Sequence, residues 1–130
     1  TKAVQDWTAP RQLDLGWFAS GPDLCNVMGT LAARAGWKPD AALLAILGQN
    51  PGVAFDHDRW KYVGFKGGHE PGVMNLTWLG QRADGKWFGV TATVNDDQHA
   101  LDEALVTNAA SGALAILGNE AAAPTPAAAP

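Results

Sequence analysis

The chain is short of the residue types that most often mark a function. It has one cysteine, Cys25, so an internal disulfide is excluded. The apolar helical pattern around Cys25 favours a buried small side chain over a reactive thiol. The nine lysines and arginines are scattered singly, and the formal net charge is -4. Without a basic stripe to track phosphates, nucleic acid is not expected as a partner.

Long apolar runs are lacking as well. No run reaches the length of about 18 apolar residues that a membrane-spanning helix needs, so no membrane span is expected. The first residues have neither a basic head before an apolar run nor an initiator methionine, and we expect the chain to be cut or incomplete at its start. Thr1 could be an N-terminal nucleophile. A processed or truncated end explains Thr1 as well, and no neighbouring residue supports catalysis.

The length of 130 residues suits one domain with a substantial core. From Asn119 onward alanine and proline repeat without any aromatic or branched apolar residue. We therefore predict a domain over residues 1–118 and an extended or disordered Ala/Pro-rich tail over residues 119–130. Residues 1–19 have no sustained hydrophobic period and read as an irregular lead-in.

Two helices are predicted after this lead-in. Ser20 precedes a proline and an acidic residue, which is typical of a capped helix start. An apolar face follows, and the helix should end at Gly36. A second, short helix should begin after Pro39 and stop at Gly48, and because it is apolar nearly all round we expect it to be buried. The apolar face of the first helix is formed by Leu24, Val27, Met28 and Leu31.

Three strands and a last helix complete the predicted fold. Alternating apolar residues predict strands at 61–65, 73–79 and 86–94, the last two joined by a turn at 83–85. A helix closed by Gly118 should cover one face of this meander. The predicted fold class is α/β of the α+β sandwich type, a three-stranded antiparallel meander covered by helices. The apolar positions of the last helix are Leu101, Ala104, Leu105, Ala109, Ala113, Leu114 and Leu117.

The most informative motif is Lys66-Gly67-Gly68, which follows the apolar run at 62–65 and precedes a turn at 69–72. Two glycines let a ligand approach the backbone closely, while the ammonium group attracts an anion. For the tripeptide taken alone, the favoured interpretation is a strand that runs into a glycine-rich hairpin with a solvated lysine. The neighbouring elements must decide between these readings.

Residues 65–72, with two hairpin-linked strands and a terminal helix after them, resemble the C-terminal part of the penicillin-recognising serine hydrolases. This family contains the class A β-lactamases and related penicillin-binding proteins. In it a Lys-Thr-Gly or Lys-Ser-Gly triad ends the third strand. Residues 19–28 are similar to the family's helix upstream of that triad. The likeness runs from about Trp17 to Leu117 and covers only the second half of a complete family domain.

The resemblance implies a role for each matching position. Lys66 would hold the substrate carboxylate and bias proton transfers at the nucleophile. Gly68 would keep the strand edge open, and the backbone amide of His69 would be one of two oxyanion-hole donors. Gly67 departs from the family, which has a threonine or serine there whose hydroxyl helps to bind the carboxylate. The expected ligand is a β-lactam-like or peptide small molecule, and no cofactor is implied.

The catalytic part of the family pattern is missing. Ser20 and Ser111, the only serines, are not followed three residues later by lysine, so the chain has no Ser-x-x-Lys nucleophile motif. We therefore expect the chain alone to be inactive, and to be a fragment whose missing N-terminal half would pair with the strand at 86–94. The alternative is a non-catalytic binding module for a cell-wall peptide or a protein partner. A periplasmic or extracellular address is implied by the resemblance only.

Two further patterns have plainer explanations. Asp56-His57-Asp58 could supply metal ligands, but in a turn before a strand it is more typical of a solvated loop, so no metal is expected. Six tryptophans could form a stacking platform for sugars or peptides. Because they are spread over separate elements, packing in the core and at its rim is the favoured interpretation.

Overall fold

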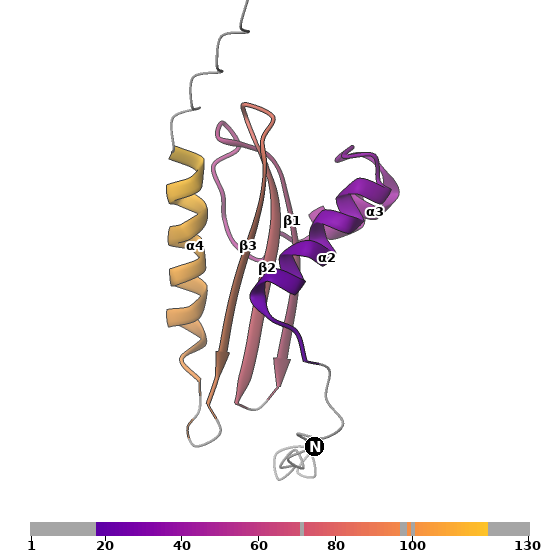
Figure 1. The fold of residues 1–130 in the computed structure, drawn as a ribbon. Coiled ribbons are helices and arrows are strands. Elements are labelled where there is room, and N and C mark those ends of the chain that lie inside the picture. The colour runs from indigo at the N-terminus through magenta and orange to yellow at the C-terminus, as the bar shows by residue number, and fades with distance from the viewer. Residues whose placement is uncertain (1–17, 71, 97–98, 100, 120–130) are drawn as a thin grey trace, which may run out of the picture.

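The computed structural model describes residues 18–70, 72–96, 99 and 101–119, and shows an α+β fold of three layers (Figure 1). Two helices cover one face of an antiparallel sheet, and a third helix lies along the other face. The sheet has three strands in the order β1-β2-β3. The elements are α2 (Gly21–Arg34), α3 (Ala42–Gly48), β1 (Trp60–Glu70), β2 (Val73–Arg82), β3 (Trp87–Asn95) and α4 (Glu103–Asn119). Residues 1–17 of the predicted lead-in and residues 120–130 of the predicted tail lie outside the described residues.

Helix α2 begins where the sequence predicts. The Ser20 hydroxyl accepts a hydrogen bond from the backbone N–H of Asp23, and the Asp23 carboxylate accepts one from the backbone N–H of Ser20. This reciprocal capping box satisfies two amides that the first turn leaves free. The carboxylate also accepts a hydrogen bond from the Ser20 hydroxyl at 2.6 Å, and these bonds lower the pKa of Asp23. Ser20 is therefore a helix cap.

The buried faces of the first two helices differ from the prediction. In α2 the buried residues are Met28 and Ala32, while Val27 is 55% exposed, so Val27 was wrongly assigned to the buried stripe. The expectation that α3 is buried all round is also wrong, because only Leu44 is buried and Ile46 is 64% exposed. One side of this short helix packs on the sheet and on α2, and nothing among the described residues covers the other.

Strands β1 and β2 are longer than predicted, and the longer β1 changes the setting of the motif. Strand β1 continues to Glu70, so Lys66-Gly67-Gly68 lies inside the strand, not beyond its end. Backbone pairing explains the extension, since β1 pairs with β2 as far as Glu70 opposite Val73. The turns after β1 and β2 contain Gly72 and Gly85 with φ of 81° and 87°, values that glycine adopts without steric cost.

The two faces of the sheet carry separate cores. The larger core lies between the sheet and α4, and the smaller lies between the sheet, α2 and α3. Trp60 and Trp78, exposed by 2% and 1%, are buried in the larger core, as the packing interpretation of the tryptophans requires. The larger core consists of Trp60, Val63, Met74, Leu76, Trp78, Val106, Ala110 and Leu114. The smaller consists of Met28, Ala32, Leu44, Tyr62 and Leu79.

Helix α4 covers one face of the sheet, as predicted, but through a different stripe. Its buried residues recur every four positions: Val106, Ala110, Leu114 and Gly118. Leu105, assigned to the apolar face from the sequence, is 66% exposed. Alanine and leucine surround this helix on all sides, so hydrophobicity alone did not indicate which side would meet the sheet.

Candidate functional site

Strand β1 divides the four predicted site residues between the two faces of the sheet. Side chains of a strand alternate between faces. Tyr62 belongs to the core beneath α2 and α3, so Lys66 and Gly68 share that face. Gly67 and His69 face α4 instead. The structure therefore brings Lys66 and Gly68 together, and separates the side-chain positions of Gly67 and His69 from them.

Lys66 is an exposed cation on this edge strand. Its ammonium group bends back and donates a hydrogen bond to the carbonyl oxygen of Gly67. Lys66 lies opposite Thr77 of β2, which lies opposite Thr91 of β3. A compact, flexible ammonium group in this position can turn outward to an anionic ligand.

The two glycines of the motif have different surroundings. Among the described residues, no atom lies within 4 Å of a Cβ atom added at Gly68, so none of them covers this glycine. A Cβ atom at Gly67 would lie 2.8 Å from Cζ of Phe65. The Phe65 ring also lies against Gly52 and contacts the Trp78 ring at a centroid distance of 4.9 Å. Glycine at position 67 thus makes room for an aromatic ring that ties β1 to the preceding loop.

His69 contacts the helix on the far side of the sheet. Its Nε2 lies 3.1 Å from Oε1 of Glu103, at the start of α4, and both side chains are more than half exposed. This contact links the end of β1 to α4. The oxyanion-hole role of the His69 amide concerns the backbone, is independent of this contact, and remains a prediction.

Beside Lys66 and Gly68 the sheet carries a polar network that sequence reasoning missed. The Asn75 side-chain amide donates to the Thr91 and Thr93 hydroxyls at 3.3 and 2.6 Å. The Thr77 hydroxyl donates to Asn75 Oδ1 at 3.0 Å and lies 3.0 Å from the Thr91 hydroxyl. We call these four residues the hydroxyl network. Alternation of polar with apolar residues along the strands was the available signal, but it cannot show that side chains of two strands bond to each other.

The hydroxyl network lies just beyond the N-terminal end of α2. A Cβ atom at Gly21 would lie 3.1 Å from the Thr91 methyl group, so the helix end covers that threonine. Thr77 is 3% exposed. Two residues beyond Lys66 on β1, Gly68 lies opposite Asn75, which in turn lies opposite Thr93. Gly68 and Thr93 are exposed, and Asn75 is half-buried. The candidate site is thus a polar shelf between Lys66 and Thr93.

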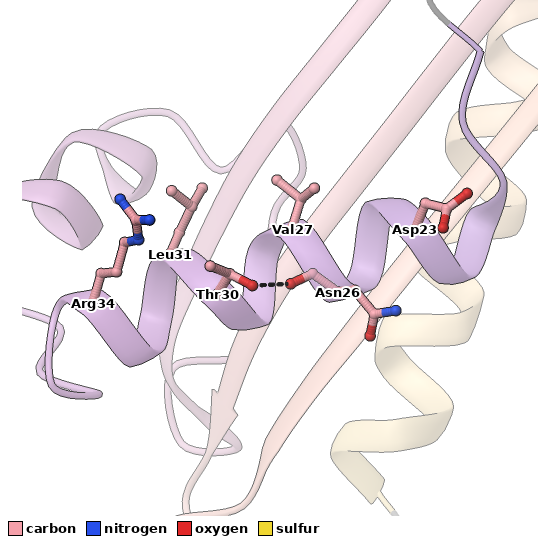
Figure 2. Close-up of a pocket in the computed structure, with 6 residues that line it drawn as sticks. All are labelled: Asp23, Asn26, Val27, Thr30, Leu31 and Arg34. Atoms are coloured by element: carbon pink, nitrogen blue, oxygen red, sulfur yellow. Dashed lines mark hydrogen bonds between the residues drawn. The ribbon is translucent and has the colours of Figure 1, made fainter.

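Two hollows in the described part of the chain lie away from this shelf. One, of about 400 Å³, follows the outer side of α2 (Figure 2). It is shallow and formed by one helix, from Asp23 to Arg34. The other, of about 240 Å³, lies between α4 and the loop before β1. Ser111 lines it, and its hydroxyl donates to the Thr107 carbonyl at 2.9 Å, one turn earlier in α4, as serines in helices often do.

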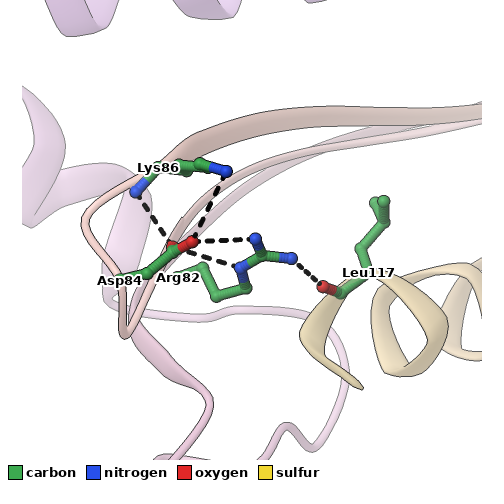
Figure 3. A network of polar contacts seen from close by, with 4 residues as sticks. All are labelled: Arg82, Asp84, Lys86 and Leu117. Atoms are coloured by element: carbon green, nitrogen blue, oxygen red, sulfur yellow. Dashed lines mark hydrogen bonds and ion pairs between the residues drawn. The ribbon is translucent and has the colours of Figure 1, made fainter. Parts of the chain in front are cut away.

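The strongest charge interactions of the described residues are structural. Arg82, 5% exposed, donates to both carboxylate oxygens of Asp84, at 3.1 and 2.8 Å, and to the carbonyl of Leu117 in α4 at 2.8 Å (Figure 3). These hydrogen bonds lower the pKa of Asp84 to about 2. The guanidinium group also lies 4.8 Å from the centre of the Phe88 ring. The network fastens the β2-β3 turn to the last turn of α4.

Tyr62 is the other strongly perturbed group. Burial raises its pKa to about 12, and its hydroxyl donates to the backbone carbonyl of Leu44 at 2.8 Å. The side chain folds over Gly64, where an added Cβ atom would collide with it. Tyr62 therefore anchors α3 to the sheet and is not positioned for proton transfer at the shelf.

The turn at residues 56–58 contains a hydrogen bond between two of its own residues. The Asp58 backbone N–H donates to the Asp56 side chain at 2.8 Å, and the Phe55 and His57 rings are in contact. Within the ranges that the structure describes, no three His, Cys, Asp or Glu side chains gather as a metal site would require. Among the described helices, none is long and apolar enough to span a bilayer.

Comparisons with protein-family models and with curated proteins give no match for this chain. The case for a function therefore depends on the chain's own residues and their arrangement.

Proposed function

We propose that this chain is the C-terminal portion of a β-lactamase-like serine hydrolase domain and supplies its substrate-binding strand. The observation that carries the proposal is the position of Lys66 and Gly68 on one face of β1, at the exposed end of that strand, with the hydroxyl network beside them. In the complete domain, a serine outside this sequence would be acylated by a β-lactam or a related amide or ester. Lys66 would hold the substrate carboxylate and stabilise charge at the reacting centre.

The order of the elements supports this proposal. Helix α2 precedes the motif, two antiparallel strands follow it, and α4 packs on the opposite face from α2. This is the order that the resemblance implies for the second half of the family domain. Gly67 lacks the hydroxyl of the family triad, and the Phe65 ring takes up the space of its side chain.

Unpartnered surfaces support the proposal of a missing N-terminal half as partner. Among the described residues β3 pairs with β2 only, so its other edge presents free backbone groups. Val27 and Ile46 on α2 and α3, and Leu105 and Ile116 on α4, are each more than half exposed. A missing half that packed on these sides would bury these side chains, which is favourable for apolar surface.

The test is a chemical one on the product of the whole reading frame. A fluorescent penicillin should label that product covalently and the chromogenic cephalosporin nitrocefin should be hydrolysed, while the 130-residue chain should do neither, because it has no Ser-x-x-Lys motif. In the whole product, Lys66→Ala should slow hydrolysis by about 100-fold, the scale of losing one electrostatic stabiliser of the transition state. Thr30→Val, on the outer side of α2, is the matched control.

A second candidate function is a non-catalytic binding module that uses the same strand to hold a cell-wall peptide or a protein partner. The absence of a nucleophile motif from the sequence favours it. If the reading frame has no Ser-x-x-Lys motif upstream and the whole product takes no penicillin label, the binding module replaces the hydrolase.

A further inference from the structure

The hollow between α4 and the loop before β1 lies on the face of the sheet opposite the polar shelf, and its lining is mixed. Phe55 and Leu114 give it apolar walls, and Asp56, Arg59 and Trp60 bring polar groups to it. Its volume is about 240 Å³. That value lies between the roughly 150 Å³ of a cavity that holds benzene and the roughly 300 Å³ or more of pockets for drug-sized ligands. The hollow therefore suits a molecule built on one ring.

Trp60 brings an unpaired hydrogen-bond donor to this hollow. Its side chain is 2% exposed, yet among the described residues its indole N–H has no acceptor. Trp78, buried in the same core, behaves as a buried indole usually does, since its N–H donates to the Pro51 carbonyl at 2.8 Å. Every side-chain nitrogen or oxygen of the described residues that is sealed from solvent has a partner. The Trp60 N–H is therefore reached through the hollow that Trp60 lines.

The N–H edge of Trp60 faces the last turn of α4, next to Arg59. A Cβ atom built at Gly118, which lines the same hollow, would lie 2.8 Å from Trp60 Nε1 and 3.5 Å from Arg59 Cβ. Of the Trp60 atoms, Nε1 lies nearest to that point. The indole N–H and the stem of the Arg59 side chain thus approach one place, and the lack of a side chain at Gly118 keeps it free. The guanidinium group on its flexible stem can reach a ligand bound there.

The Arg59 guanidinium group is only weakly held by its neighbour. Its Nε lies 4.0 Å from Oδ2 of Asp56, and the two side chains are 55% and 60% exposed. A surface pair of this kind stabilises little. Asp56 is also engaged elsewhere, because its Oδ1 accepts a hydrogen bond from the Asp58 backbone N–H at 2.8 Å. The guanidinium group can therefore turn to a ligand carboxylate, which its planar fork of N–H groups matches.

We propose that this hollow binds a small carboxylic acid whose apolar body is about one ring in size. The carboxylate accepts the indole N–H of Trp60 and pairs with the Arg59 guanidinium group, and the ring packs against Phe55 and Leu114. A buried N–H without an acceptor is costly, and a carboxylate oxygen removes that cost. The inference does not rest on the proposed function, since the polar shelf lies on the other face of the sheet.

The experiment is an NMR titration of the ¹⁵N-labelled 130-residue chain, read at the indole N–H signal of Trp60. The probes are benzoate, benzamide, which has no charge, and acetate, which has no ring. Benzoate should shift the Trp60 signal and leave that of Trp78 in place, because the Trp78 N–H is already bonded. Benzamide and acetate should each bind more weakly than benzoate, since each lacks one half of the ligand that the hollow accommodates.

Variants of exposed residues test the pairing without disturbing the core. Arg59→Met should weaken benzoate by about 2- to 5-fold, the scale of one surface ion pair, and leave benzamide unchanged. Asp56→Asn should tighten benzoate binding, because it removes a competing carboxylate and keeps an oxygen that can accept from Asp58. Lys61→Met is the matched control, since Lys61 is an exposed cation of β1 that does not line the hollow.

Each outcome decides for or against the site. If benzoate leaves the Trp60 signal unchanged, the hollow holds water only and the inference is wrong. Binding that Arg59→Met does not weaken, or that Lys61→Met weakens equally, would overturn the pairing with Arg59 and the inference with it. A shift at Trp60 that depends on Arg59 supports the site whatever penicillin labelling shows, so this inference and the proposed function fail separately.

Discussion

At the residue scale, the motif combines two glycines that serve different purposes. Gly68 leaves its backbone uncovered by any described residue, and Gly67 leaves room for the Phe65 ring inside the protein. The sequence predicted the tripeptide as a binding element but could not distinguish these purposes. The distinction depends on which face of the sheet each glycine lies on and on the position of the Phe65 ring, which packs against Trp78. Both follow from tertiary packing.

The first prediction concerns Gly67. Gly67→Ser should destabilise the protein by about 1–3 kcal/mol, the usual cost of overpacking, because the new Cβ atom would lie 2.8 Å from Phe65 Cζ. The ring cannot simply move away, since it contacts Trp78 and lies against Gly52. Urea unfolding measures the change. Gly68→Ser is the matched control and should change the stability little, because that position has open space.

A double mutant tests the cause. Adding Phe65→Leu removes the end of the ring and should make Gly67→Ser less costly than in the wild-type background. Additive losses from the two substitutions would contradict the explanation.

The second prediction concerns Tyr62. Tyr62→Phe removes the hydroxyl that donates to the Leu44 carbonyl, a bond additional to those within helix α3. A loss of about 0.5–1.5 kcal/mol is expected for one hydrogen bond. Amide hydrogen exchange should accelerate first in α3, since Tyr62 is its anchor to the sheet. Uniform acceleration across all elements would show that the bond is not specific to α3.

At the scale of elements, the order of helices and strands was predictable because each has a local signal. The capping residues at Ser20 and the turn glycine at Gly85 mark element ends with little dependence on the rest of the chain. The buried side of α4 was not predictable. An alanine-rich helix presents similar surfaces all round, and the choice of Val106 over Leu105 depends on the register against the sheet.

The third prediction concerns the turn between β2 and β3. Folding lowers the pKa of Asp84 to about 2 from an unfolded value near 3.8, so the carboxylate contributes stability above that unfolded value. This stability should be lost as the pH falls through the range from about 4 to about 2. Asp84→Asn should remove this part of the pH dependence, which urea unfolding at several pH values would measure. An unchanged acid slope in Asp84→Asn would contradict the assignment.

Arg82 also bonds to α4, so its replacement should affect that helix. Because its guanidinium donates to the Leu117 carbonyl, Arg82→Met should loosen the last turn of α4 as well as the hairpin. Faster amide exchange confined to these two places is the expected result. Lys86→Met, which removes an exposed cation 3.9 Å from Asp84, is the milder control.

At the scale of the whole molecule, the described residues form two cores on one small sheet and leave apolar side chains exposed on both outer sides. The sequence predicted an exposed outer edge on the last strand, because the resemblance implies further strands beside it, and among the described residues that edge has no partner. It did not indicate the exposure of Ile46 or Leu105. Periodicity locates apolar stripes but not the partner that covers them.

The fourth prediction follows from these surfaces. The 130-residue chain should associate with increasing concentration, because a free strand edge and exposed apolar residues favour contact between copies. Sedimentation velocity measures this. Val94→Lys, on the free edge strand β3, should shift the chain toward monomers, since lysine on an edge blocks strand pairing. A chain that stays monomeric and unfolds cooperatively would count against the fragment proposal.

The measurement that tests the central claim most directly is covalent penicillin labelling of the whole reading frame's product, with and without Lys66→Ala. We predict a stable label on a serine outside the 130 residues, and labelling slowed by about 100-fold in the variant. The absence of any label, or a label whose rate does not depend on Lys66, would contradict the account.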